Sequence, residues 1–170
     1  MPHITILYTA EQIQKAVQEI AQQIRARFGD EEPVMVLCLL NGSIWYAADL
    51  LRALPSNFIL HTVKVSSYAG TCSTGKLHWH TPLPDCTGKR VLALDDMLDT
   101  GLTMKSVCEE LLQHGAAEVV STVAIDKQGR RAVDFHADYC ALTCGNHYLV
   151  GYGMDYNGSY RNLPYIGRID

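Results

Sequence analysis

The first clear periodicity along the chain is helical. Thr9 and Gln12 have the spacing of a capping box, in which each side chain bonds the backbone amide of the other residue. Apolar residues then recur every three or four positions until Gly29, a residue typical of helix ends. These positions are Ile13, Val17, Ile20, Ile24 and Phe28. The pattern predicts a helix that ends at about Phe28.

A continuous apolar run without alternation follows at 34–40, as expected for a strand covered on both faces in a parallel sheet. Helical spacing resumes at 44–54, where Pro55 stops it. The other predicted elements are strands at 58–65, 90–94 and 118–125, a helix at 104–114, and short strands at 139–142 and 148–152. Strands alternating with helices predict an α/β fold with a mostly parallel sheet, whose ligands bind at the carboxyl ends of the strands.

One long connection interrupts this alternation. Residues 66–87 are rich in Gly, Ser, Thr and Pro. A loop of this length in a compact domain is usually functional. We therefore expect this connection to have a role in ligand binding.

Composition narrows the class of protein. A length of 170 residues predicts one domain, and 48% apolar with 19% charged residues is typical of a globular protein. No apolar stretch reaches membrane-spanning length and no secretory signal is recognisable, so we expect a cytoplasmic protein without a membrane partner. A formal net charge of -4 without a Lys/Arg cluster argues against a nucleic-acid partner. This balance suits a protein that meets an anionic ligand together with Mg²⁺.

Residues 91–103 carry the strongest chemical signal. An apolar strand ends in two adjacent carboxylates, Asp95 and Asp96, and a third, Asp99, opens a Gly-containing turn before the next helix. Backbone N–H groups of such a turn attract an anion, and the two flanking threonine hydroxyls can bond its oxygens. The turn is neither a Walker loop nor a dinucleotide-binding Gly motif. The segment predicts a sugar-phosphate site with carboxylates left for hydroxyls, a divalent cation or a proton.

This turn resembles the phosphoribosyl pyrophosphate loop of type I phosphoribosyltransferases. Further segments resemble hypoxanthine-guanine phosphoribosyltransferases: a pyrophosphate loop and helix at 39–52, a lid at 66–70, and a carboxyl-terminal signature at 151–157 and 160–164. The resemblance covers about residues 5–167. It indicates salvage of 6-oxopurines rather than of adenine or pyrimidines.

The resemblance implies a type I phosphoribosyltransferase fold: a mostly parallel twisted sheet flanked by helices, with a small hood formed by terminal segments. It implies a single domain over residues 1–170 with a mobile lid at about 66–85. The implied substrates are phosphoribosyl pyrophosphate and a 6-oxopurine, hypoxanthine or guanine, which give IMP or GMP and pyrophosphate. The implied cofactor is Mg²⁺, and the implied assembly is a homodimer or homotetramer.

Asp99 is the candidate base for the N7 proton of the purine, although an Asp before a helix is also a common N-cap. The resemblance implies that Lys127 recognises the purine O6. Without the resemblance, Lys127 would be interpreted as a solvated lysine at a strand end. Tyr148 would stack on the base, and without the resemblance it would be assigned to the core. The predicted purine-binding residues are Lys127, Tyr148, Leu149 and Asp155.

The resemblance also implies the donor site. The predicted phosphoribosyl and 5′-phosphate residues are Asp95, Asp96, Met97, Leu98, Thr100, Gly101, Leu102 and Thr103. The predicted pyrophosphate residues are Leu40, Asn41, Gly42, Ser67, Tyr68 and Arg161. The predicted Mg²⁺ ligands are Asp95, Asp96 and Asp155, and either Asp155 or Arg161 could instead form a surface ion pair.

Two positions depart from the family pattern. Asn41 stands where a lysine is usual, in a loop whose peptide is often cis, and removes a positive charge that would face pyrophosphate. Asp95 stands where Glu is often found and is one methylene shorter. A water or metal bridge could therefore replace its direct contact with the ribose.

Three other functions share parts of this pattern. A regulatory protein of the same fold keeps the phosphate loop, but such proteins show a basic surface and often lack the carboxylate at the position of Asp99. A xanthine-preferring enzyme differs only in how the pocket treats the purine 2-position, which the sequence leaves open. A phosphoribosyl pyrophosphate synthase needs more length than 170 residues.

Overall fold

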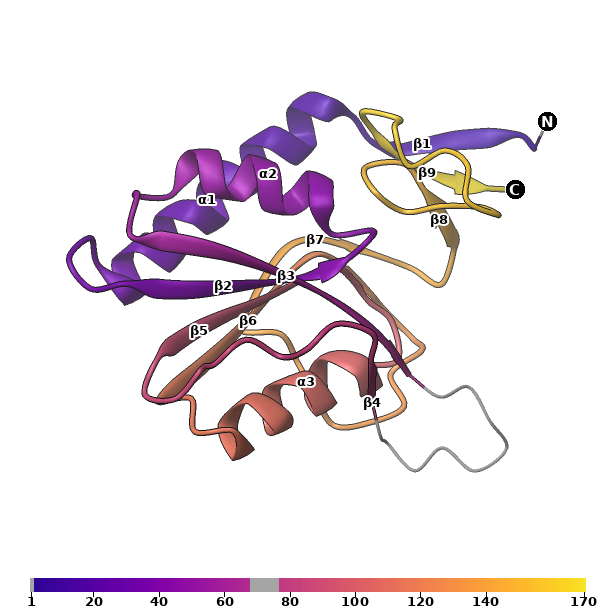
Figure 1. Ribbon diagram of the computed structural model, residues 1–170. Helices are drawn as coiled ribbons and strands as arrows, with labels where there is room; N and C mark the ends of the chain where they lie inside the picture. The colour runs from indigo at the N-terminus through magenta and orange to yellow at the C-terminus, as the bar shows by residue number, and fades with distance from the viewer. Residues whose placement is uncertain (1, 68–76) are drawn as a thin grey trace.

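The computed structural model describes residues 2–67 and 77–170 (Figure 1). The expected lid at about 66–85 therefore lies partly outside the described residues. The elements in chain order are β1 (Ile4–Tyr8), α1 (Ala10–Phe28), β2 (Val34–Leu40), α2 (Ile44–Ala53), β3 (Phe58–Ser67), β4 (Leu77–Trp79), β5 (Arg90–Leu98), α3 (Leu102–Gln113), β6 (Glu118–Lys127), β7 (Tyr139–Cys144), β8 (Tyr148–Val150) and β9 (Ile166–Ile169).

Within the described residues, the larger sheet has six strands in the order β4-β3-β2-β5-β6-β7. The strands from β3 to β7 in this order pair in parallel, and the short β4 pairs antiparallel with β3. Helices α1 and α2 lie on one face of the sheet and α3 lies on the other (Figure 1). The mostly parallel, helix-flanked sheet that the sequence predicts is confirmed.

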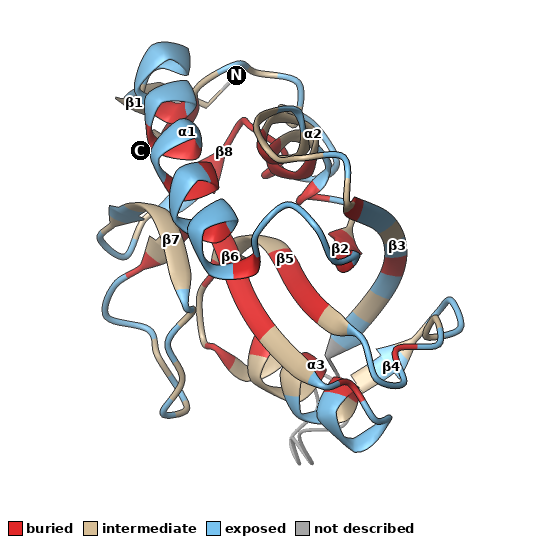
Figure 2. Ribbon diagram, turned by 90° about the vertical axis from the view of Figure 1, so that its left-hand side faces the viewer, coloured by how far each residue is buried: buried red, intermediate tan, exposed pale blue. Residues whose placement is uncertain are grey.

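Strand β2 shows why its sequence is apolar throughout. Val34 and Val36 pack in the core beneath α1 and α2, whereas Met35 and Leu37 pack in the core that contains α3. Figure 2 shows buried residues concentrated along the central strands and on the inner sides of α1 and α2. Because helices cover both faces of the sheet, successive side chains are buried on alternate sides.

Helix α1 begins and ends where its pattern predicts. The Thr9 hydroxyl accepts the Gln12 N–H at 3.4 Å, and the Gln12 side chain accepts the Thr9 N–H at 2.9 Å, so the capping box is confirmed. The helix ends at Phe28, and Gly29 follows with a φ of 74°. Neither this helix nor any other in the described ranges is long and apolar enough to cross a membrane.

Three element boundaries beside the predicted site differ from the sequence prediction. The third strand was expected to end at Leu94, but β5 continues to Leu98 because β6 stays paired with it, with Leu98 opposite Asp126. Strand β6 likewise continues to Lys127, because β7 stays paired with it. Helix α3 begins at Leu102, two residues earlier than expected. The acidic residues 95 and 96 therefore lie within a strand, not after it.

The smaller sheet brings together distant parts of the chain. Strands β1 and β8 both pair antiparallel with β9, so that Ile4 lies opposite Ile169. The sequence pattern assigns no strand to residues 4–8 or 166–169, because each is short and its partner lies far along the chain. The small sheet lies beyond the carboxyl end of β2 (Figure 1) and corresponds to the expected hood of terminal segments.

Tyr46 connects α2 to the sheet. Its side chain is fully buried, and its hydroxyl oxygen lies 2.7 Å from the hydroxyl oxygen of Thr122 on β6. Burial raises the pKa of Tyr46 above its ordinary range, so the phenol stays neutral. This hydrogen bond fixes the helix that follows the predicted pyrophosphate loop.

We expect Tyr46→Phe to lower the free energy of unfolding by about 1 to 3 kcal/mol, because the Thr122 hydroxyl loses its partner inside the core. Urea unfolding followed by circular dichroism measures this change. Tyr156→Phe is the control, since Tyr156 is exposed, and should cost less than about 0.5 kcal/mol. Equal losses in the two variants would contradict the prediction.

Candidate active site

A pocket of about 250 Å³ lies where the carboxyl ends of β5 and β6 meet the small sheet. Parallel strands bring their carboxyl ends to one edge of the sheet, where α/β proteins bind ligands. The lining residues are Asp96, Met97, Asp99, Lys127, Arg130, Tyr148, Leu149, Met154 and Asp155. The sequence predicts all of these as site residues except Arg130 and Met154.

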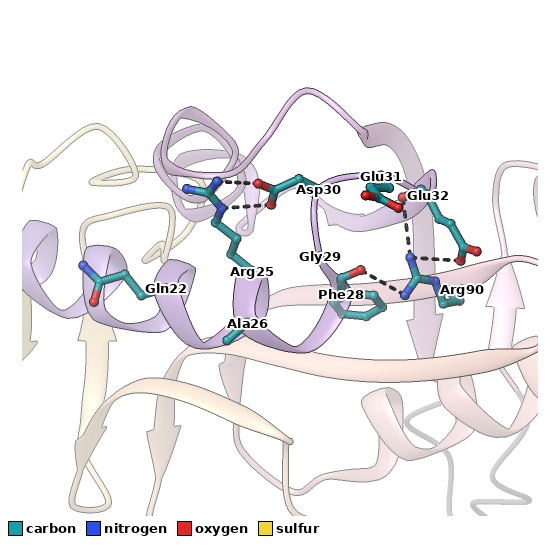
Figure 3. A pocket seen from close by; sticks show the side chains of 9 residues that line it. All are labelled: Gln22, Arg25, Ala26, Phe28, Gly29, Asp30, Glu31, Glu32 and Arg90. Atoms are coloured by element: carbon teal, nitrogen blue, oxygen red, sulfur yellow. Dashed lines mark hydrogen bonds and ion pairs between the residues drawn. The ribbon is translucent and has the colours of Figure 1, made fainter.

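A larger pocket, of about 720 Å³, lies at the opposite edge of the sheet, between the end of α1 and the start of β5 (Figure 3). Arg25 pairs there with Asp30. Arg90 donates to the Phe28 carbonyl oxygen at 3.1 Å and lies 3.5 Å from the Glu32 carboxylate. The two arginines that line the larger pocket are thus paired with neighbouring acceptors. We therefore take the pocket of about 250 Å³ as the candidate site.

Asp95 and Asp96 place two acidic groups side by side near the end of β5. The Asp95 carboxylate accepts the Asp96 N–H at 2.9 Å. Burial raises the pKa of Asp95 well above its ordinary value, and the neighbouring Asp96 charge adds to this. Burial also raises the pKa of Asp96, although its hydrogen bond with Asp95 and the charge of Arg161 act in the other direction. A cation beside this pair would therefore be favourable.

At Gly42 the predicted pyrophosphate loop lies against the Asp96 side chain of β5 and against the backbone of the loop after β8. The Leu40–Asn41 peptide of this loop is cis. A Cβ atom on Gly42 would overlap the Asp96 carboxylate, and one on Gly153 would overlap the carbonyl oxygen of Gly42. A substitution at Gly42 would displace the Asp96 carboxylate, and one at Gly153 would displace the backbone at Gly42.

The turn between β5 and α3 is built around Gly101, whose φ of 84° lies in the left-handed region that favours glycine. Gly101 is also the N-cap of α3, so the alternative role of Asp99 as N-cap is wrong. The Thr100 hydroxyl accepts the Leu102 N–H at 3.4 Å, and Thr103 lies in the first turn of the helix. This arrangement is suited to binding an anion at the N-terminus of α3.

The Asp99 carboxylate faces two cations. Its Oδ2 lies 3.9 Å from Nζ of Lys127 and 3.5 Å from Nη1 of Arg130. Its Oδ1 is buried and has no hydrogen-bond partner among the described residues. Lys127 is only 5% exposed, so its interpretation as a solvated lysine is wrong. A buried ammonium and a carboxylate therefore share one pocket.

The small sheet supplies an aromatic ring. Tyr148 is 54% exposed, so the assignment of this residue to the core is wrong. Its hydroxyl donates to the Asp155 carbonyl oxygen at 3.3 Å, and its ring packs edge to face against Tyr156 with centroids 5.6 Å apart. One face of the pocket therefore offers an accessible aromatic surface.

Asp155 and Arg161 pair with each other at 2.6 Å, both partly buried. Arg161 also donates to the Gly153 carbonyl oxygen at 2.5 Å. The second carboxylate oxygen of Asp155 accepts the Gly158 N–H at 2.7 Å. Both residues thus hold the loop between β8 and β9 together.

The predicted lid residues of the pyrophosphate site are Ser67 and Tyr68. Ser67 is the last residue of β3, where it lies opposite Leu77 of β4. Tyr68 lies outside the described residues. Their contact with pyrophosphate stays a prediction.

Comparison with known proteins identifies the family. A model of the phosphoribosyl transferase domain matches residues 3–157. The chain belongs to the phosphoribosyltransferase family. A hypoxanthine-guanine-xanthine phosphoribosyltransferase of Tritrichomonas foetus is 37% identical over 164 residues, covering 95% of this chain and 89% of that protein. A hypoxanthine-guanine phosphoribosyltransferase of Aquifex aeolicus is 38% identical over 169 residues, covering 98% and 95%.

Solved structures agree with this identification. The crystal structure of a hypoxanthine phosphoribosyltransferase from Staphylococcus aureus is similar, with a TM-score of 0.92 and 33% identity over 98% of this chain and 91% of that chain. The type I phosphoribosyltransferase fold and the resemblance to hypoxanthine-guanine phosphoribosyltransferases are therefore confirmed.

This phosphoribosyltransferase has polar residues at the site that the sequence interpretation missed. Asp126, Arg130 and Arg131 lie at or just after the end of β6. Arg131 pairs with Asp126 and donates to the main-chain oxygen of Asp99 at 2.7 Å. Two consecutive arginines, three and four residues after Lys127, are the signal that could have identified this cluster.

The pKa of Asp95 is raised in the folded protein. At pH values between the ordinary pKa and the raised one, the folded protein therefore binds more protons than the unfolded chain. Stability therefore falls as pH rises through that window. Asn at this position removes the charge and can still accept the Asp96 N–H. We expect Asp95→Asn to unfold at a higher temperature than the parent at neutral pH, with a flatter pH dependence. Thermal unfolding in a chelator between about pH 5 and pH 8 measures both effects.

The matched control is Asp134→Asn, since Asp134 is an exposed carboxylate. Its unfolding temperature should follow that of the parent at every pH. An Asp95→Asn protein that is less stable than the parent at neutral pH would show that the ionised carboxylate stabilises the fold, contrary to the prediction.

Proposed function

We propose that this chain transfers the 5-phosphoribosyl group of phosphoribosyl pyrophosphate to hypoxanthine and guanine, giving IMP or GMP and pyrophosphate. It would act in purine salvage, as a single domain over residues 1–170. One observation carries the proposal at the site: a buried lysine and a carboxylate face each other in one pocket beside a turn suited to a phosphate. Together they supply a purine-binding donor, a proton acceptor and a phosphate site.

Lys127 would select the 6-oxo group of the base. Its ammonium has donors only, so it can pair with O6 of hypoxanthine or guanine. With adenine, the exocyclic amine would face the Lys127 ammonium, so that two donors meet. A buried donor would then lack an acceptor, which is costly. The accessible ring of Tyr148 can stack on the purine next to Leu149.

Asp99 would take the N7 proton. When purine N9 bonds to the ribose and the bond to pyrophosphate breaks, N7 gives its proton to the carboxylate and the product base is neutral. Oδ1 of Asp99, which lacks a hydrogen-bond partner among the described residues, is the acceptor that this role needs.

Asp95 and Asp96 would bind the ribose hydroxyls, and the turn at 100–103 would bind the 5′-phosphate. Positive charge develops on the ribose ring as pyrophosphate leaves, and two adjacent carboxylates can stabilise it electrostatically. Met97 and Leu98 continue β5 into the turn and fix its direction.

The donor set of the site fits Mg²⁺. This ion prefers hard oxygen ligands and is usually held by one or two carboxylates together with substrate phosphates. Asp95 and Asp96 supply such oxygens, and because burial raises the pKa of both carboxyl groups, a positive charge beside them would be favourable. When bound, Mg²⁺ would neutralise negative charge on pyrophosphate. For Asp155 to act as a ligand, its bonds to Arg161 and Gly158 would first have to change.

Pyrophosphate would lie against the loop from Leu40 to Gly42 and near Arg161, with Ser67 and Tyr68 supplied by the predicted lid. Asn41 brings no charge to this place. Arg161 would then be the main protein cation that faces the leaving group, through a fork suited to phosphate oxygens.

A xanthine-preferring activity is the second candidate, because the Tritrichomonas foetus relative carries xanthine in its name. The regulatory alternative is opposed by the presence of Asp99 and by the net charge of -4. A cytoplasmic location, a homodimer or homotetramer, and the absence of nucleic-acid and membrane partners stay predictions.

A spectrophotometric assay tests the proposed function. The purified protein is given Mg²⁺, phosphoribosyl pyrophosphate and, separately, hypoxanthine, guanine, xanthine and adenine. We expect turnover with hypoxanthine and guanine and none with adenine. Faster turnover with xanthine would favour the second candidate, and no turnover with any base would favour the regulatory one.

We expect Asp99→Asn to lower kcat by about 10² to 10⁴-fold, because the amide has the shape of the carboxylate but cannot accept the proton as a base. Steady-state assays with hypoxanthine measure this, and thermal unfolding checks that the variant is folded. The exposed Asp134→Asn variant again serves as control. A kcat within tenfold of the parent would exclude Asp99 as the base.

A further inference from the structure

We propose that Arg131 is a positioning residue: its guanidinium holds the turn at 99–101 against the end of β6 and thereby orients both Asp99 and the phosphate-binding amides. The inference deepens the proposed function and rests on it where turnover is the readout.

A turn that binds a phosphate through its N–H groups must keep those groups unbonded. Among the described residues, no intramolecular hydrogen bond is donated by the amides of Thr100 or Gly101. The next amide, that of Leu102, donates within the described residues only to the Thr100 hydroxyl of the same turn, at 3.4 Å. The rest of the protein can therefore hold the turn only through its carbonyl oxygens. The donors of these hydrogen bonds have to come from other segments of the chain.

Both carbonyl oxygens are held by one short segment. Nη1 of Arg131 donates to the carbonyl oxygen of Asp99 at 2.7 Å, and the N–H of Ala132 donates to the carbonyl oxygen of Thr100 at 2.9 Å. The aliphatic part of Arg131 also lies against Gly101, because a Cβ placed there would be 3.0 Å from its Cδ. Residues 131 and 132 therefore contact the whole left-handed turn.

The other arm of the guanidinium is anchored. Nη2 of Arg131 pairs with Asp126, and the two side chains are only 19% and 15% exposed. Asp126 lies on β6 opposite Leu98, the last residue of β5. The planar fork thus connects the strand next to β5 with the first carbonyl after β5, a geometry that a lysine ammonium cannot reproduce.

The adjacent Arg130 makes a different contact with Asp99. Its Nη1 lies 3.5 Å from the Asp99 carboxylate, and its side chain is 49% exposed. Arg130 therefore contacts the charge of Asp99, whereas Arg131 contacts its backbone. Since catalytic groups must be held within a fraction of an ångström, loss of the backbone contact should affect donor binding and proton transfer together.

The main test is Arg131→Lys, which keeps the positive charge and the aliphatic stem. We expect kcat to fall about 10- to 100-fold and the KM for phosphoribosyl pyrophosphate to rise, while the KM for hypoxanthine changes less than threefold. Asp126→Asn weakens the anchor without removing the bond to Asp99 and should give a smaller change in the same direction. It also serves as the second variant if Arg131→Lys does not fold.

Arg27→Lys is the matched control, because Arg27 makes two hydrogen bonds to Glu118, away from the pocket. It should leave kcat and both KM values unchanged. If Arg131→Lys loses activity only in proportion to unfolded protein, or raises the two KM values equally, the arginine is structural and the proposal fails.

Amide hydrogen exchange gives a readout that needs no turnover. In Arg131→Lys, exchange of the Ala132 amide, which donates to the Thr100 carbonyl oxygen, should speed up at least tenfold, while exchange in the middle of α3 stays as in the parent. Unchanged exchange at Ala132 would overturn the proposal even if the parent is active. If exchange at Ala132 is faster in the variant but the parent shows no turnover, the positioning role stands and the proposed reaction is removed.

Discussion

The candidate site depends on the close approach of three chain segments at Gly42. The Asp96 carboxylate lies on one side of this glycine, and Gly153 lies against its carbonyl oxygen. These segments come from the loop after β2, the end of β5 and the loop after β8. Because Gly42 has no side chain, the loop that would bind pyrophosphate lies directly against the Asp96 carboxylate and against the loop after β8.

This crowding also concentrates charge. Asp95, Asp96 and Asp99 lie within five consecutive positions of the sequence. Three basic residues approach them from elsewhere: Lys127 from β6, Arg130 from the loop after it, and Arg161 from the loop between β8 and β9. The acidic groups come from one contiguous segment, whereas the basic groups come from three. The positions of the cations relative to the anions therefore depend on the fold as a whole.

The same contrast explains what the sequence could predict. The alternation of strands and helices, the capping box at Thr9 and the turn at 99–103 are local patterns, and the structure contains each of them. The length of β5 was missed because pairing with β6 overrides its acidic composition. Strands β1 and β9 were missed because each needs a partner from far along the chain. Arg131 was missed because its importance comes from contacts with Asp126 and the Asp99 carbonyl, which have no periodic signature.

The pairing of β9 also determines when the purine side of the pocket can form. Strand β8, which carries Tyr148 and Leu149, pairs within the described residues only with β9, and β9 in turn pairs with β1. The pairing of β1 with β9 joins the two most distant segments of the chain, and contacts of such sequence separation form late in folding as a rule. The phosphate turn, built from neighbouring residues, can therefore take shape before the small sheet is complete. A chain that is still being synthesised would acquire the phosphate turn before the strand that carries Tyr148 and Leu149 has its partners.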